Sequence, residues 1–153
     1  MKFHLQKSLV LFVFCSILYG CSMNVRFHDQ NEAAKIAKSF SESAFIKQDF
    51  SKSLNYMFTV PNTKESYLHL EQLIKRMHPT GIYPKTIKAE EYEIPVNSPV
   101  IRIYLQGVTE NNEKIFYCIV LMQNDKSYKV SEIYRNKQNE PYPLQNGLPR
   151  KPL

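Results

Sequence analysis

The spacing of apolar residues changes once along the chain, near residue 81, and this change constrains the fold more than any other feature. Before it, apolar residues recur at the intervals of an α-helix, and after it they alternate with the period of a β-strand. Helices followed by a run of strands predict an α+β domain. The length of 153 residues suits one such domain.

The first predicted helix covers residues 33–44, where the apolar residues share one face. Asp29 precedes it and has the chemistry of an N-cap. Phe45 and Ile46 leave the apolar face, so we expect this helix to bend or end near Gln48.

Two further helices are expected before the strands. Asp49 would cap a short helix that carries Leu54 and Met57. Thr63 would cap a longer one that runs to about Met77.

Four strands are predicted in the second half of the chain, and their short connections indicate an antiparallel meander. The third strand is apolar on both faces, which is typical of an interior strand covered on both sides. The alternation slips at Glu90-Glu91, which predicts a bulge or kink there, and Gly107 near the end of the second strand is a candidate for another bulge. The strands are expected at residues 86–94, 100–108, 115–122 and 128–134.

The first twenty residues have the zones of a secretory signal. Lys2 and Lys7 form a basic start without any acidic residue, and residues 9–18 are almost entirely apolar. This apolar run is too short for a membrane-spanning helix, which needs roughly 20 residues.

The sequence at the end of this segment, Leu18-Tyr19-Gly20-Cys21, resembles the lipobox of bacterial lipoproteins. Tyr19 departs from the pattern, in which small residues are commoner. The resemblance implies a diacylglycerol on the Cys21 sulfur, cleavage before Cys21, and an N-palmitoyl group on its new amino terminus. Ser22 stands where Asp signals retention at the inner membrane, which implies an outer-membrane lipoprotein facing the periplasm.

The expected partner of Cys21 is therefore the lipid bilayer, because two or more acyl chains hold a protein stably where one does not. An ordinary signal peptide with a chance cysteine, or an uncleaved anchor, are the alternatives that the residues leave open.

The order of helices and strands resembles the NTF2-like (cystatin-like) fold, in which a curved sheet forms a cone around the first helix. The similarity is carried by the helix at 33–44, the break at 47–50 and the closing strand that begins at 127–130. The family has no shared catalytic residues. Its members often pair through their sheets, so a homodimer is one expectation, although the oligomeric state stays open.

Together these features divide the chain into four segments. They are a lipoprotein signal peptide at 1–20, a lipidated stalk at 21–30, an NTF2-like α+β domain at 31–136 and a Pro-rich tail at 137–153. Because its prolines exclude a helix or a central strand, the tail is expected to be extended or to lie on the domain.

No residue set with the spacing of a metal or nucleophile site is found. His28, His69 and His78 lack metal-ligand spacing, and no HExxH, CxxC or GxSxG motif is present. His69, one helical turn from Glu65, is interpreted as part of a solvated face. Cys118 lies in the most apolar strand, where a thiol packs as a small hydrophobe with a raised pKa.

Acidic residues are the remaining candidates for chemistry. Glu90 and Glu91 point to opposite sheet faces unless a bulge rotates one of them. Glu93 lies nearby, and we interpret all three as a solvated strand edge. One of them, or Glu132, would line the mouth of the cone if the cone is open.

The net charge of +6 does not indicate nucleic-acid binding, because the basic residues are scattered rather than clustered. It fits anionic lipid or an acidic protein partner. We therefore expect no cofactor and favour a non-catalytic lipoprotein that binds a protein or small ligand. The alternatives are an immunity or inhibitor lipoprotein against a toxin, and an enzyme that uses an NTF2-like pocket.

Overall fold

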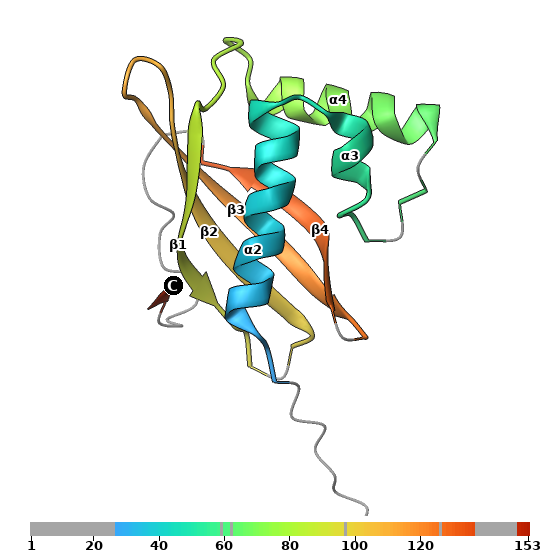
Figure 1. The fold of residues 1–153 in the computed structure, drawn as a ribbon, viewed down its shortest axis with the longest axis vertical. Coiled ribbons are helices and arrows are strands. Elements are labelled where there is room, and N and C mark those ends of the chain that lie inside the picture. Colours follow the sequence, from blue (N-terminus) through green and yellow to red (C-terminus); the bar gives the residue numbers. More distant parts are fainter. Residues whose placement is uncertain (1–26, 59, 62, 97, 126, 137–149) are drawn as a thin grey trace, which may run out of the picture.

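The computed structural model describes residues 27–58, 60–61, 63–96, 98–125, 127–136 and 150–153. Within them, helices precede an antiparallel five-stranded sheet, so the predicted α+β class is confirmed. Figure 1 shows α2 along one face of the sheet and α4 at the end opposite to the start of α2. The elements are α2 (Gln30–Ser41), the π-helix η1 (Glu42–Ile46), α3 (Phe50–Leu54), α4 (Lys64–Met77), β1 (Thr86–Glu93), β2 (Val100–Val108), β3 (Lys114–Asn124), β4 (Ser127–Arg135) and β5 (Lys151–Pro152).

The predicted signal segment and Cys21 lie outside the described residues, as does most of the Pro-rich tail. In the part of the chain that the structure describes, no helix has both the length and the apolar character needed to cross a membrane.

The sheet confirms the predicted meander. Its strand order is β4-β3-β2-β1-β5, and every pair of neighbours is antiparallel. At the edge, β5 pairs Pro152 with Glu91 and Lys151 with Tyr92. A proline is tolerated there because an edge strand has no second neighbour that needs its missing N–H. The described end of the tail therefore lies extended on the domain.

The predicted N-caps of the three α-helices are confirmed. The side chains of Asp29, Asp49 and Thr63 each accept a hydrogen bond from a backbone N–H in the first turn of α2, α3 and α4. Such caps satisfy donors that have no partner within the helix and typically contribute about 1 kcal/mol each.

A π-helical turn explains why Phe45 and Ile46 leave the apolar stripe of the first helix. Lys47 N donates to Glu42 O over 2.9 Å, a five-residue spacing that widens the turn. This turn directs Phe45 into the core, where it is fully buried. The helix ends before Gln48, whose φ of 51° breaks the helical path as predicted.

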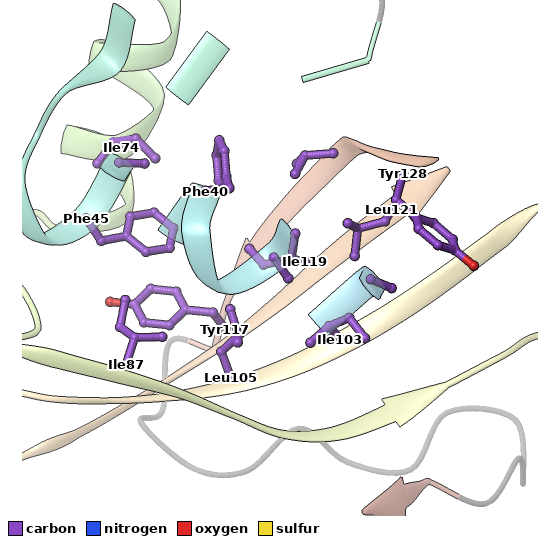
Figure 2. Close-up of a cluster of buried hydrophobic side chains, with 14 of the residues drawn as sticks. Phe40, Phe45, Ile74, Ile87, Ile103, Leu105, Tyr117, Ile119, Leu121 and Tyr128 are labelled. Atoms are coloured by element: carbon purple, nitrogen blue, oxygen red, sulfur yellow. The ribbon is translucent and has the colours of Figure 1, made fainter. Parts of the chain in front are cut away.

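The main core lies between the helices and one face of the sheet, which we call the inner face. Phe45 and Tyr117 stack there with ring centroids 4.5 Å apart. Figure 2 shows side chains from helices and strands meeting in this layer. The labelled residues are Phe40, Phe45, Ile74, Ile87, Ile103, Leu105, Tyr117, Ile119, Leu121 and Tyr128.

Of the two predicted bulges, one is confirmed and one is wrong. The register between β1 and β2 shifts between Ala89 and Glu91, as the slipped alternation predicted. Gly107, in contrast, pairs regularly with Ile87 on β1. Its glycine is explained by close packing, because a Cβ there would lie 2.8 Å from the Cβ of Pro84.

Candidate functional site on the outer face of the sheet

The sheet has a second face, which we call the outer face, whose residues alternate with those of the main core along β2 and β3. Tyr104, Cys118 and Val120 form a separate buried cluster there, with Val100 packed against it. This cluster contains no helical residue. The outer face therefore carries side chains that the packing of the helices does not use.

A buried carboxylate is the centre of this face. The Glu93 side chain is only 1% exposed. Arg102 Nη1 donates to Glu93 Oε1 over 2.7 Å, and the Tyr104 hydroxyl donates to Glu93 Oε2 over 2.7 Å. Both carboxylate oxygens are thus satisfied, which is what makes a buried charge tolerable.

Tyr104 acts in this network as a neutral hydrogen-bond donor. Burial, assisted by the hydrogen bond to Glu93, raises the pKa of Tyr104 well above its ordinary value. The Arg150 guanidinium lies over the Tyr104 ring, 3.9 Å from the ring centroid. Arg150 also donates to Glu91 Oε2 over 3.2 Å, so it joins β5 to β1 through side chains as well as backbone.

Cys118 lies beside this network and remains a thiol. Burial raises its pKa to about 12, which leaves almost no thiolate at neutral pH. The interpretation of Cys118 as an unreactive packing residue agrees with this environment. It belongs to the outer cluster, however, and not to the main core.

Two hollows in the surface share Tyr104 as a wall. The first has a volume of about 370 Å³ and is bordered by residues that include Glu90, Glu91, Gln106, Phe116 and Arg150. The second has a volume of about 420 Å³ and is bordered by residues that include Arg102, Cys118, Val120, Glu132 and Tyr134.

The first hollow also settles the geometry of the paired carboxylates. Glu90 and Glu91 both border it, because the bulge after Ala89 breaks the alternation that would separate them. The interpretation of all three glutamates as a solvated edge is correct for the exposed Glu90 and wrong for the buried Glu93. Glu132 accepts a hydrogen bond from the Tyr134 hydroxyl at the second hollow.

A larger hollow of about 770 Å³ lies beside the end of α4. Its charged wall residues include Arg76 and Glu113, which are exposed, and Arg135, which is partly buried. Arg135 Nη1 donates to the Met77 carbonyl over 2.5 Å. Glu113, the acidic residue of its lining, is exposed, whereas Arg102 and Tyr104 at the outer hollows are held by the buried Glu93. The outer face therefore offers the better-defined set of polar groups.

The three described histidines, which lack metal-ligand spacing in the sequence, lie apart in the structure. His69 is exposed on α4, as the solvated-face interpretation predicted, and His28 lies at the start of α2. Among the described residues, no group of three or more His, Cys, Asp and Glu could hold a metal ion.

His78 is the buried member of this set. Its Nδ1 donates to the Ile82 carbonyl over 2.9 Å, and its ring stacks on Tyr83. The Tyr117 hydroxyl lies 3.5 Å from Nε2, which is left as an acceptor. Burial lowers the pKa of His78, and the nearby positive charge of Arg135 lowers it further. His78 is therefore a neutral ring in a packed aromatic cluster.

Sequence reasoning missed the pairing of Glu93, Arg102 and Tyr104. Alternation places Arg102 and Tyr104 on one face of β2, which was the available signal. Their meeting with Glu93 depends on the register set by the connection after β1, which residue types alone do not determine.

Comparison with known proteins gives no match: no family model, curated protein or solved structure is similar to this chain.

Proposed function

We propose that this protein is an envelope lipoprotein, anchored by acyl chains on Cys21, whose outer sheet face binds a protein or small ligand without catalysis. The observation that carries the binding role is the fixed polar network of Glu93, Arg102 and Tyr104 between two hollows. A preorganised set of polar groups beside apolar walls is typical of a recognition site.

The protonation of this site supports binding rather than catalysis. Tyr104 and Cys118 both have raised pKa values, so both keep their protons at neutral pH. A general base or a nucleophile needs a pKa near the working pH or an activating neighbour. The Tyr104 proton is instead held in the hydrogen bond to Glu93, and Cys118 offers a small apolar surface.

For the fold, our proposal is the NTF2-like cone, with the sheet curved around α2. Phe40, Phe45 and Tyr117 are fully buried on the inner face, beneath the sheet, so the interior near them is occupied by side chains. This packing argues against an enzyme with its pocket beneath the sheet, and it favours the outer face as the binding surface.

The anchor is tested by Cys21→Ala, with Cys15→Ala as the matched control inside the segment proposed to be removed. Cys21→Ala is expected to leave the chain unprocessed or to release it from membranes, while Cys15→Ala retains the processed, acylated mass. Intact-mass spectrometry and separation of outer from inner membranes give the readout. A mature wild-type chain without acyl groups would contradict the proposal.

The binding face is tested with a photoreactive amino acid placed at Tyr134, which borders the second hollow and is 49% exposed. Leu68 on α4 is a matched control, since it is 44% exposed and lies away from the outer face. In cells, the Tyr134 position is expected to give a cross-linked product of one discrete mass. A product of twice the chain mass would identify a second copy of the chain as the partner. Equal cross-linking at both positions, or none at Tyr134, would contradict the outer face as the site.

A further inference from the structure

Exposed apolar side chains gather at the end of the domain where α2 begins. Phe27 is 85% exposed, Val96 is 76% exposed and Ile94 is 37% exposed. Ile94 and Val96 belong to the connection between β1 and β2, which Figure 1 shows at the same end of the domain as the start of α2. We call Phe27, Ile94 and Val96 the anchor-end patch.

Hydrogen bonds fix the two parts of this patch relative to each other. His28 Nε2 donates to the Ser98 carbonyl over 2.9 Å and so joins the residue after Phe27 to the connection that carries Val96. On the other side, Asp29 N donates to the Tyr128 hydroxyl over 2.8 Å, and the His28 ring stacks on Tyr128. The exposed side chains are therefore presented by a braced part of the domain.

The position of this patch in the chain limits its distance from the anchor. Phe27 follows Cys21 by six residues. Even a fully extended chain of this length spans at most about 20 Å. Phe27 therefore cannot lie farther than this from the residue that, under the proposed function, carries the acyl chains.

We propose that the anchor-end patch inserts into the surface of the membrane that holds the lipid anchor, and so fixes the orientation of the domain. This inference rests on the proposed lipidation of Cys21. Protruding apolar side chains next to an acyl anchor fit the boundary between lipid headgroups and acyl chains, where buried apolar area adds to binding.

The charges at this end indicate how the contact is made. Among the described residues, the N-cap Asp29 and the first-turn residue Glu32 place acidic side chains at the start of α2. An attraction to anionic headgroups would require basic residues instead. The exposed groups of the patch are apolar, so we expect their insertion not to require anionic lipid.

The chain contains no tryptophan, so a single introduced tryptophan reports on its own surroundings. Val96→Trp places the probe in the patch, and Leu68→Trp places it on α4 at the opposite end of the domain. Each processed, acylated variant is reconstituted in phosphatidylethanolamine vesicles, with and without phosphatidylglycerol, and with brominated lipid as the quencher.

In the Val96→Trp protein, brominated lipid is expected to remove most of the emission, and the emission maximum is expected to shift to shorter wavelength at either lipid composition. The Leu68→Trp protein should keep its emission and respond only to acrylamide in the water. If Val96→Trp behaves like Leu68→Trp while the protein floats with the vesicles, the patch proposal is wrong and the anchor stands. If intact mass shows no acyl chains and the protein does not float, the anchor and the patch proposal both fall.

Discussion

Glu93 and Arg102 occupy directly paired positions on β1 and β2, and their side chains form an ion pair of 2.7 Å on the outer face. Glu93 is 1% exposed and Arg102 is 29% exposed, so the acidic partner depends on the basic one for compensation of its charge. The Tyr104 hydroxyl completes the carboxylate's hydrogen bonds. The fold therefore needs the buried Glu93, which also holds Arg102 and Tyr104 in place at the walls of the two hollows.

Replacement of Arg102 by alanine should destabilise the domain by about 3 kcal/mol, because it leaves the buried Glu93 charge without its ionic partner. Urea denaturation gives the measurement. The control is Glu71→Gln, which removes an exposed ion pair with Lys75 on α4 and should cost much less. Equal losses in the two variants would contradict the role assigned to Glu93.

The thiol of Cys118 should be almost unreactive in the folded protein. Its pKa is raised from 9.0 to about 12, so at pH 8 the thiolate fraction of the folded protein is lower than that of an unperturbed thiol by roughly 10³-fold. Alkylation by iodoacetamide, followed on the Cys118 peptide by mass spectrometry, should be slower by about that factor than in urea. Alkylation of the native chain at the rate of the unfolded chain would show that Cys118 is accessible and ionised.

The local elements of this fold were predictable because their signals are local. Asp29, Asp49 and Thr63 cap helices through side chains that reach only two or three residues along the chain. The strands were predictable for the same reason, since alternation is read within a single segment. The meander followed from the short connections between those segments.

The site was not predictable to the same extent, because it depends on contacts between distant residues. Glu93 resembles a solvated edge residue until the register of β1 and β2 places it against Arg102 and Tyr104. The regular pairing of Gly107 was also hidden, since its cause is the approach of Pro84 from outside the strand. Pairing and close packing are properties of the assembled sheet and not of a segment.

Gly107→Ala should destabilise the domain by about 1–3 kcal/mol through overpacking. The new Cβ would lie 2.8 Å from the Pro84 Cβ and 3.2 Å from Tyr117 Cε2, and both neighbours are buried. Thermal unfolding measures the loss. In the Pro84→Gly background, Gly107→Ala should cost less stability than it costs in the wild-type protein. An additive double variant would argue against the contact with Pro84.

The stability of the domain should fall as the pH drops below about 6.5, with His78 as one cause. Burial lowers the pKa of His78 in the folded state from its ordinary value of 6.5, so below that pH the unfolded chain binds a proton that the folded chain does not. Stability from this group is therefore present above pH 6.5 and is lost progressively as the pH falls toward the folded-state pKa.

The measurement is urea denaturation of wild type, His78→Gln and His69→Gln between pH 5 and pH 8. His78→Gln removes the titrating ring, so its stability should vary less with pH than that of wild type, even though the variant is less stable at every pH. His69 is exposed on α4, so His69→Gln should keep the pH dependence of wild type. If His78→Gln retains the full acid-induced loss, another group is responsible and the neutral, buried state assigned to His78 is wrong.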